Sequence, residues 1–477
     1  MERNNKNGEG KAALILVIAL LVVIGISLLP IGRWSGGKIK DFNLLGDIMN
    51  DSVAAAIYDN EVEVENTMEV DPELAKVQES ESRDTLDRQE SDPAGLMTES
   101  DSGYREVPVL PAKPARVGDI VVIEDYTIDN RGLSSLKSAI ASRTHARIAV
   151  VGDSYIEGDI FTQDLREKLQ NAYGGQGVGY VNMHSDFPGF RKSIKQGGKG
   201  WKTFTALKKA KNRYMALSEQ YSTPTGSALS TYAGTSSFPH AGSWTVSRFL
   251  FISPDDAVVS YRTGKGEWVD HEIKGDSVVQ CISIDGLTEN FEVKTSATSL
   301  IGLGVWLDGT DGVSVDCMSS RGFSGITLSR ISTRLCRQMS QSIPYNLIVL
   351  EFGINAMSPQ QKDYHIYSNR MVDVINHVKS CYPGADILLM GIGDRGEKRG
   401  GAVHSMSVAP AMIAAQRDAA RRAHCLFWDT REAMGGEDAI VEWSRQGLAN
   451  KDYIHLTHKG GACLADELFN AIQQCLK

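Results

Sequence analysis

The sequence predicts an α/β domain with a parallel sheet, an inserted β-rich domain and an N-terminal apolar helix. Two buried-strand patterns, NLIVLEFG (346–353) and DILLMGIG (386–393), flank a helix-like stretch over 363–382. This alternation is typical of a parallel sheet covered by helices on both faces. Short alternating segments interrupt it between 196 and 319, which predicts an insertion. An uncharged run over 12–29 precedes both parts of the chain.

The N-terminal segment predicts a tail over 1–11, a transmembrane anchor over 12–31 and a linker over 32–106. The apolar run has 18 residues, close to the roughly 20 that span a bilayer. It ends in LLPIGRW without a small-x-small cleavage site, which favours an uncleaved anchor over its nearer rival, a signal peptide. Residues 61–101 carry 14 acidic against 3 basic side chains, a net charge of −11, so the linker is expected to be largely disordered.

The basic residues on the two sides of the run are equal in number, so the positive-inside rule gives no orientation. The short N-terminal tail and the long acidic linker favour a single-pass protein whose catalytic domain is periplasmic or otherwise extracytoplasmic. The chain of 477 residues has a net charge of −9 and no basic patch with interleaved aromatics. The sequence therefore predicts no nucleic-acid partner.

Neither the cysteines nor the histidines predict a metal site. The seven cysteines include no C-x-x-C pair, and the ten histidines are scattered without ligand spacing. The odd number leaves at least one thiol free. Cys281 and Cys317 are candidates for a disulfide, which the sequence leaves open.

The α/β domain is predicted as two segments, 107–195 and 320–477, with the inserted domain over 196–319. Its first βα unit is the strand ARIAVV (146–151) and the helix at 162–175. Inside the insertion, short alternating segments separated by Gly- and Asp-rich turns favour a β-sandwich or jelly roll. These segments lie at 257–262, 268–273, 277–284, 290–295, 300–307 and 313–317.

Ser154 stands in VGDSYIEGD, at a sharp turn between the first strand and its helix. A serine there is either a helix N-cap or a nucleophile, and a nucleophile needs a base held by a third group. NKDYIHLTHKGG supplies both: Asp452 would hold His455, which would take the proton from Ser154. His458 is the rival base, but only His455 has an aspartate three residues before it.

Acyl transfer also needs donors for the developing oxyanion. Three groups are candidates: the backbone N–H of Ser154 at the start of its helix, a glycine in RGFSG (321–325), and Asn355 in EFGINAM, just beyond a strand end.

These motifs resemble blocks I, II, III and V of the SGNH, or GDSL-type, hydrolases. On this resemblance Ser154, Gly325, Asn355 and His455 take the four name positions and Asp452 completes the triad, while Gly322 competes with Gly325. Tyr155 replaces the leucine of the GDSL name. The resemblance implies a flavodoxin-like three-layer fold and a serine esterase that needs no cofactor. It extends to cell-envelope members with a β-sandwich insert, some of which remove O-acetyl groups from peptidoglycan.

An acylated glycan is therefore the expected substrate, and membrane attachment is expected through the N-terminal helix. Arg395, which follows a strand on the presumed active-site side, and Tyr155 are substrate-binding candidates, although a plain loop arginine is the favoured explanation for Arg395. Tryptophans in or near the insert could stack on sugars or fill its core. The alternatives are a glycan O-acyltransferase with the same triad, a general lipase- or thioesterase-like esterase, and a non-catalytic glycan-binding protein.

Overall fold

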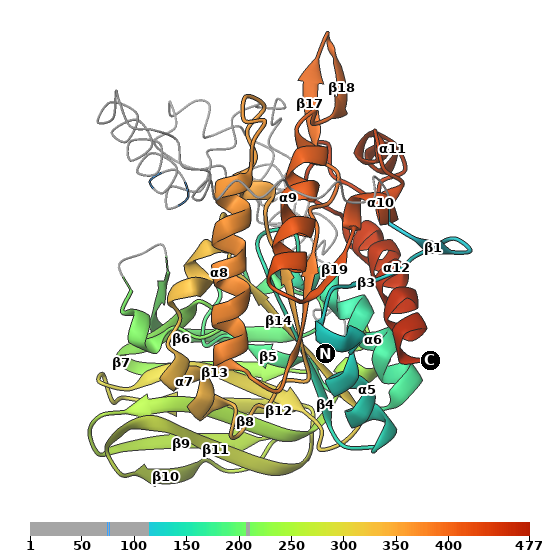
Figure 1. Ribbon diagram of the computed structural model, residues 1–477. Helices are drawn as coiled ribbons and strands as arrows, with labels where there is room; N and C mark the ends of the chain where they lie inside the picture. Colours follow the sequence, from blue (N-terminus) through green and yellow to red (C-terminus); the bar gives the residue numbers. More distant parts are fainter. Residues whose placement is uncertain (1–73, 75, 77–113, 207–209) are drawn as a thin grey trace, which may run out of the picture. The chain divides into compact units, whose positions relative to one another are not determined.

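The computed structural model describes residues 74, 76, 114–206 and 210–477 (Figure 1). The predicted tail, the predicted anchor and all but two residues of the linker lie outside this part of the chain. Among the helices of the described part, none is both long and apolar enough to cross a membrane.

A six-stranded sheet forms the centre of the α/β domain, in the order β14-β4-β15-β16-β19-β3. The first five strands run parallel, and β3 pairs antiparallel with β19 at the edge. The four strands β4, β15, β16 and β19 are buried throughout, as expected for a sheet covered on both faces. The strands are β14 (Val313–Ser319), β4 (Ala146–Gly152), β15 (Leu347–Glu351), β16 (Asp386–Met390), β19 (Leu426–Trp428) and β3 (Glu124–Asp125).

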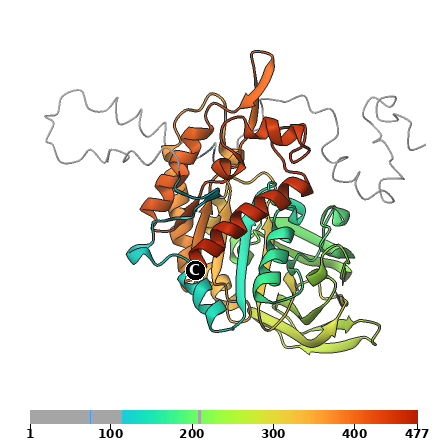
Figure 2. The same ribbon diagram turned by 90° about the vertical axis from the view of Figure 1, so that its right-hand side faces the viewer.

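Helices lie on both faces of this sheet. Right-handed crossovers place the helices that follow β14, β15 and β16 on one face and the helix that follows β4 on the other. Helix α8 packs on α9 and α12 packs on α6, and Figures 1 and 2 show these pairs on opposite sides of the sheet. The helices are α5 (Ser134–Ala141), α6 (Thr162–Tyr173), α7 (Thr333–Met339), α8 (His365–Cys381), α9 (Ala409–Arg422), α10 (Thr430–Met434), α11 (Ala439–Arg445) and α12 (His458–Leu476).

Short elements complete the α/β domain. Two hairpins extend from it, and β17–β18 projects at the top of Figure 1. The hairpins pair β1 (Arg116–Val117) with β2 (Ile120–Val121) and β17 (Gly396–Arg399) with β18 (Ala402–Ser405). Along the described chain the 3-10 turns are η1 (Ile128–Asn130), η2 (Glu157–Asp159), η3 (Pro188–Phe190), η4 (Asn212–Tyr214), η5 (Pro239–Ala241), η6 (Ile326–Arg330) and η7 (Ile354–Ala356).

The chain between β4 and β14 contributes nine antiparallel strands that form one sheet, with the path β10-β9-β12-β7-β13-β8-β11, β5 on β13 and β6 on β7. Strands β7 and β13 share one residue pair. The strands are β5 (Gly179–Val181), β6 (Lys195–Thr205), β7 (Gln220–Ala233), β8 (Trp244–Ser253), β9 (Ala257–Thr263), β10 (Val269–Ile273), β11 (Asp276–Thr288), β12 (Asn290–Thr295) and β13 (Ile301–Asp308).

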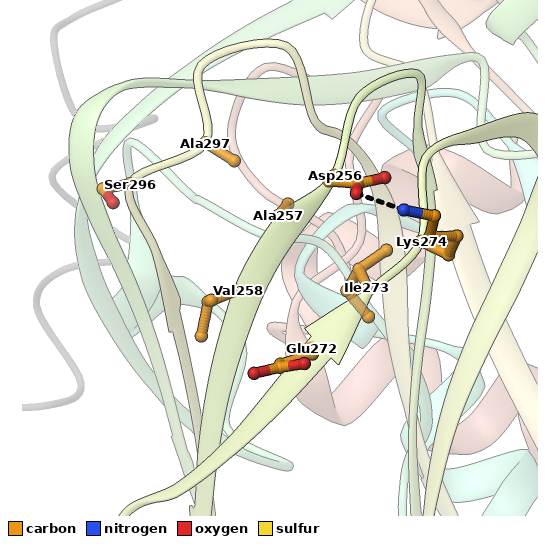
Figure 3. Close-up of a pocket in the computed structure, with 8 residues that line it drawn as sticks. All are labelled: Asp256, Ala257, Val258, Glu272, Ile273, Lys274, Ser296 and Ala297. Atoms are coloured by element: carbon orange, nitrogen blue, oxygen red, sulfur yellow. Dashed lines mark hydrogen bonds and ion pairs between the residues drawn. The ribbon is translucent and has the colours of Figure 1, made fainter.

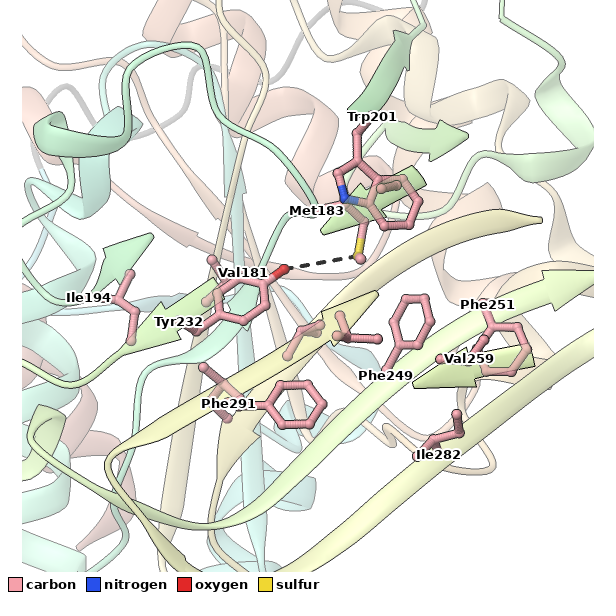
Figure 4. Packing of buried hydrophobic residues seen from close by; sticks show 14 of the residues in the cluster. Val181, Met183, Ile194, Trp201, Tyr232, Phe249, Phe251, Val259, Ile282 and Phe291 are labelled. Atoms are coloured by element: carbon pink, nitrogen blue, oxygen red, sulfur yellow. Dashed lines mark hydrogen bonds between the residues drawn. The ribbon is translucent and has the colours of Figure 1, made fainter. Parts of the chain in front are cut away.

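The sheet has two arms, one of β10, β9, β12, β7 and β6 and one of β13, β8, β11 and β5. Residues of both arms form one hydrophobic cluster (Figure 4). Phe249 and Phe251 of β8 stack with ring centroids 4.9 Å apart, and Phe291 of β12 and Tyr232 of β7 stack beside them. Trp244 is fully buried, whereas Trp201 is 8% exposed at the edge of the cluster. Packing of both arms around one core is what a sandwich requires, so the sandwich remains the predicted description.

Two strands fall outside the domain bounds predicted from the sequence. β5 was assigned to the α/β domain, but it pairs with β13 of the nine-stranded sheet. β14 was assigned to the insertion, but it pairs with β4 of the parallel sheet. Its alternation of Val with Ser and Asp suggested a half-exposed strand. The polar side chains are instead buried, because Asp316 accepts hydrogen bonds from Trp306 and Tyr345 at 2.8 and 2.7 Å.

Candidate active site

The turn that carries Ser154, called here the nucleophile turn after the predicted role of that residue, begins where β4 ends, beside the end of β15. Gly152 is needed there because a Cβ atom would lie 2.6 Å from the carbonyl oxygen of Glu351. Ser154 follows within a tight turn, and the next regular helix, α6, begins at Thr162. Ser154 therefore does not cap that helix. Its N–H also does not lie at the start of the helix, which corrects the expectation from the sequence. Its Oγ lies 3.0 Å from Nε2 of His455.

His455 and its aspartate come from the loop before α12. Nδ1 of His455 lies 2.8 Å from Oδ2 of Asp452, and Oδ1 accepts the backbone N–H groups of Ile454 and His455. Tyr453 between them has a φ of 57°, a strained conformation that turns the loop inward. Ser154, His455 and Asp452 thus form one hydrogen-bonded chain. His458, the rival base, is the first residue of α12 and contacts Gln163 instead.

The electrostatics of the loop favour an ionised Asp452. Burial alone would raise the pKa of this carboxyl, but the hydrogen bond and charge of His455 and the two backbone N–H groups outweigh burial. The net result is a pKa below the ordinary value for aspartate. The anion is therefore present at neutral pH to orient the imidazole and to stabilise its charged form.

Asn355 lies in η7, directly after β15, and is 2% exposed. Its Nδ2 donates to Oδ2 of Asp153 at 2.8 Å and to the carbonyl oxygen of Phe323 at 3.0 Å. Asp153 also accepts the backbone N–H of Tyr155 at 2.9 Å. Asp153 therefore connects the nucleophile turn to Asn355, a role that the sequence analysis missed although the residue stands in the GDS motif.

A second carboxyl group, Glu351, lies against Asp153 at the end of β15. It is 1% exposed, and neither of its carboxyl oxygens makes a hydrogen bond of ordinary geometry within the described residues. Burial, and then the charge of Asp153, raise the pKa of Glu351 well above its ordinary value. Burial also raises the pKa of Asp153 to about 7, against the lowering effect of Tyr155 N–H, His455 and Asn355. Asp153 and Glu351 together therefore still hold a proton at a pH at which Asp452 is ionised.

The loop after β14 carries the two competing glycines. Gly325 has a φ of 89°, and a Cβ atom there would lie 2.7 Å from the Phe352 ring. Gly322 also has a positive φ, but a Cβ atom would meet nothing within 4 Å. Close packing therefore constrains Gly325 more than Gly322, while the assignment of the oxyanion donor stays a prediction.

The two predicted substrate-binding side chains are buried beside the site and do not line its cleft. Tyr155 is 1% exposed and its hydroxyl donates to the sulfur of Met434 at 3.2 Å. Arg395 is 2% exposed and donates from Nη1 to the carbonyl oxygen of Ile354 at 3.0 Å. Arg395 thus supports the turn that carries Asn355. Within the described chain, no cluster of three or more His, Cys, Asp or Glu side chains could hold a metal ion.

A cleft of about 540 Å³ lies between the nucleophile side of the α/β domain and the nine-stranded sheet. Glu157, three residues after Ser154, forms an ion pair with Arg321 at its edge, with Arg321 Nε 2.8 Å from Glu157 Oε2. Phe323, whose carbonyl oxygen binds Asn355, also lines it. The opposite wall is contributed by Trp201, Thr203, Thr205 and Gln220. Ligand sites commonly measure about 300–1,000 Å³.

A buried ion pair joins the parallel sheet to the nine-stranded sheet. Nη1 of Arg147, in β4, lies 2.6 Å from Oδ2 of Asp308, in β13, and 3.5 Å from Oδ1 of Asp316. A second hollow, of about 660 Å³, is lined by residues of the nine-stranded sheet and its turns, including the ion pair of Lys274 with Asp256 (Figure 3). Neither hollow is lined by the predicted site residues themselves. The first is lined by Glu157, three residues after Ser154, and by Phe323, whose carbonyl oxygen binds Asn355, so it is the candidate substrate site.

Residues 275–462 match the family model of the GDSL-like Lipase/Acylhydrolase family, a stretch that contains Gly325, Asn355, Asp452 and His455. The matched stretch assigns the α/β domain to the SGNH, or GDSL-type, hydrolases. As an SGNH hydrolase it is an enzyme that acts on ester bonds. Ser154 precedes the matched stretch because most of the nine-stranded sheet intervenes. No curated protein matches the chain.

Three solved structures that resemble the chain are esterases or lipase-like proteins by their descriptions, and one of them shares the fold over most of the chain. A structure described as "Peptidoglycan O-acetylesterase in action, 5 min" is 21% identical with a TM-score of 0.61, and the alignment covers 74% of this chain and 99% of that one. A family two carbohydrate esterase from Cellvibrio japonicus is 10% identical (TM-score 0.26; 59% and 98% covered). A putative GDSL-like lipase from Parabacteroides merdae is 14% identical (TM-score 0.28; 35% and 74% covered). The first of these structures has the same fold as this chain.

Proposed function

We propose that this SGNH hydrolase is a serine esterase that removes O-acetyl groups from an envelope glycan, such as peptidoglycan, through an acyl-enzyme. The observation that carries the proposal is the hydrogen-bonded chain from Ser154 Oγ to His455 Nε2 (3.0 Å) and from His455 Nδ1 to Asp452 (2.8 Å). The Ser154 end of this hydrogen-bonded series lies three residues before Glu157, which lines the cleft shared with the nine-stranded sheet. A nucleophile, a base and an orienting acid in this order are the parts that acyl transfer requires.

In the first half of the reaction, Ser154 Oγ attacks the acetyl carbonyl carbon while His455 Nε2 takes the hydroxyl proton. The carbonyl oxygen becomes an oxyanion, for which the N–H groups of Ser154 and Gly325 and the Asn355 amide are the proposed donors. Both hydrogens of that amide are engaged in this structure. One of them must turn from the Phe323 carbonyl to the oxyanion, while Asp153 keeps the other in place.

Collapse of the tetrahedral intermediate breaks the bond to the sugar oxygen, which receives the proton from His455. The acetyl group remains on Ser154. His455 then takes a proton from a water molecule, and the hydroxide attacks the acetyl carbonyl to release acetate. Asp452 stays ionised throughout and stabilises the imidazolium in both halves.

The composition of the cleft supports a glycan substrate. Its walls combine aromatic side chains (Phe187, Trp201, Phe323) with amide and hydroxyl groups that can bind sugar hydroxyls (Asn182, Gln196, Thr203, Gln220). The fold shared with a peptidoglycan O-acetylesterase points in the same direction. The nine-stranded sheet supplies one of the two walls, which gives the insertion a role in binding.

Acetate release is the test. The full chain and its Ser154→Ala variant are incubated with O-acetylated peptidoglycan, acetylated xylan and p-nitrophenyl acetate. The proposal expects fastest release from peptidoglycan and loss of activity on all three in the variant. Equal activity of the variant contradicts the mechanism. Acetate that appears only after a glycan acceptor is added identifies a transferase instead.

A cleft-filling variant tests the glycan site separately. Thr205 ends β6 on the cleft wall, and Thr205→Trp should lower kcat/KM on peptidoglycan by about ten-fold, the size of a modest steric discrimination. Hydrolysis of p-nitrophenyl acetate should be unchanged. Thr263→Trp, at the end of β9 and outside the cleft, is the matched control. An equal effect of both variants on both substrates would show that the cleft is not the glycan site.

We also propose that the enzyme works outside the cytoplasmic membrane, held by the apolar segment over 12–31. The length of the uncharged run supports an anchor. Membrane fractionation and protease treatment of intact cells test this. The proposal expects a membrane-bound chain that external protease cleaves after the outer envelope is opened, and a chain in the cytosolic fraction contradicts it.

A further inference from the structure

Two buried cysteines face each other on the side of the α/β domain that carries α7 and α8. Cys336 lies in the middle of α7 and Cys381 is the last residue of α8, and both side chains are excluded from solvent. Thr333, one turn before Cys336 on the same helix face, accepts a hydrogen bond from Cys381 Sγ at 3.6 Å. Both thiols therefore lie in the interface between the two helices.

A second contact joins α7 to the C-terminal end of α8. Nη2 and Nε of Arg337 donate to the carbonyl oxygen of Ser380 at 2.9 and 3.2 Å. Arg337 and Ser380 are the sequence neighbours of the two cysteines, so the cysteine positions cannot separate without breaking this contact. Each thiol also affects the pKa of the other more than any other group does.

This contact makes the two thiols unequal. The hydrogen bond from Cys336, more than any other cause, lowers the pKa of Cys381 to about 6, against the effect of burial. The same bond raises the pKa of Cys336. Cys425 is also buried, and burial raises its pKa to about 12. A thiolate beside a thiol is the arrangement that thiol–disulfide exchange uses.

We propose that Cys336 and Cys381 form a disulfide that joins α7 to α8 when the chain folds in an oxidising compartment. The Cys381 thiolate attacks one sulfur of an oxidised dithiol donor, which releases one donor thiolate and leaves a mixed disulfide. The Cys336 thiolate then attacks Cys381 Sγ and releases the second donor thiolate. The two cysteines lose two electrons and two protons, and the donor disulfide is reduced by the same two electrons.

The disulfide would enclose the segment from α7 to the end of α8, which contains β15 and Asn355. A cross-link of this kind stabilises a protein mainly by restricting its unfolded chain. Because both sulfurs are buried in the folded chain, the exchange with the donor takes place during folding, as the two thiols come together. All seven cysteines are free thiols in this structure, the proposed pair included. Of the pair named from sequence, Cys281 and Cys317, the Cys317 Sγ donates to the carbonyl oxygen of Ile156 at 3.4 Å.

Peptide mapping of the refolded full chain tests the proposal without reference to esterase activity. The reduced, unfolded chain is refolded in a mixture of reduced and oxidised glutathione, free thiols are alkylated, and peptides are analysed by mass spectrometry without reduction. We expect the Cys336 peptide joined to the Cys381 peptide, while Cys425 is alkylated. Alkylation of both Cys336 and Cys381 in the folded protein overturns the proposal, as does joining of either to another cysteine.

Denaturant unfolding gives an independent readout. Dithiothreitol should lower the urea midpoint of the oxidised wild-type chain, because reduction removes the cross-link. The Cys336→Ala/Cys381→Ala chain should show no such shift, and Cys425→Ala, which removes a buried thiol outside the pair, should shift as the wild type does. A wild-type midpoint that dithiothreitol leaves unchanged contradicts the proposal even if the double variant fails to fold.

Discussion

Two groups of carboxyl side chains lie at the same edge of the parallel sheet, and their surroundings give them opposite properties. In the loop before α12, Asp452 accepts two backbone N–H groups and contacts His455, which holds its pKa below the ordinary value. At the ends of β4 and β15, Asp153 and Glu351 are buried with fewer donors, which raises the pKa of both. Burial raises the pKa in both groups, and only at Asp452 do the hydrogen bonds and the charge of His455 together outweigh it.

The contrast also separates two tasks. In the proposed mechanism, Asp452 supplies a fixed negative charge to the base, whereas Asp153 positions Asn355 and the Ser154 turn through hydrogen bonds. Glu351 contributes no charge to either task while it keeps its proton. Substitutions that remove charge should therefore act very differently in the two groups.

The largest effect is expected at Asp452. Asp452→Asn should lower kcat on p-nitrophenyl acetate by about 10⁴-fold at neutral pH, because the amide favours the wrong imidazole tautomer and cannot stabilise the charged form. Initial rates at saturating substrate measure the effect, and circular dichroism checks the fold. A loss below ten-fold would show that the charge of Asp452 is not used.

Asn355→Ala should lower kcat by about 10²- to 10³-fold, the effect of removing one oxyanion donor. KM should change little, because the oxyanion forms only in the transition state. Steady-state kinetics with p-nitrophenyl acetate separates the two constants. A variant that raises KM and keeps kcat would place Asn355 in substrate binding instead.

Asp153→Ala should cost about 10- to 100-fold in kcat, the value of a hydrogen bond to a charged group. The double variant with Asn355→Ala should be little worse than Asn355→Ala alone, because Asp153 acts through Asn355. The double-mutant cycle in kcat is the measurement. Independent losses that multiply would separate the two residues and break the proposed connection.

Glu351→Gln should leave kcat within a few-fold of wild type and change the pH dependence of stability instead. A carboxyl whose pKa is raised by folding contributes its full stability below its unfolded pKa, and that stability is lost as pH rises toward the folded pKa. The neutral amide removes this loss, so the variant should gain stability relative to wild type between about pH 5 and 8. Urea unfolding across this range measures the difference, and a constant difference contradicts it.

Much of the fold follows from local sequence patterns, and the exceptions have physical causes. The buried strands around 146–151, 346–353 and 386–393 are apolar throughout, which identifies a parallel sheet. β6 and β7 were not predicted, because glycine and proline interrupt the alternation of apolar and polar residues that marks a strand. These residues are Gly197, Gly198, Pro224 and Gly226. β14 lies in a different domain from the one predicted, because its place depends on pairing with β4, a strand far earlier in the chain.

The candidate site was predictable where residues act through spacing. Asp452 and His455 are three residues apart, so a single loop can bring them together. Asp153 and Glu351 were not assigned a role, because their proximity depends on the pairing of β4 with β15. The burial of Tyr155 and Arg395 depends on which segments pack over them, and the sequence carries no local signal for that.

Labelling with a fluorophosphonate tests the central claim, that Ser154 is the nucleophile activated by His455 and Asp452. The full chain is treated with the probe and the modified peptide is identified by mass spectrometry. We predict one adduct, on Ser154, which is absent from Ser154→Ala, forms far more slowly on Asp452→Asn and forms at the wild-type rate on Glu351→Gln. An adduct on another residue, or no adduct on a chain that still hydrolyses p-nitrophenyl acetate, would contradict the account.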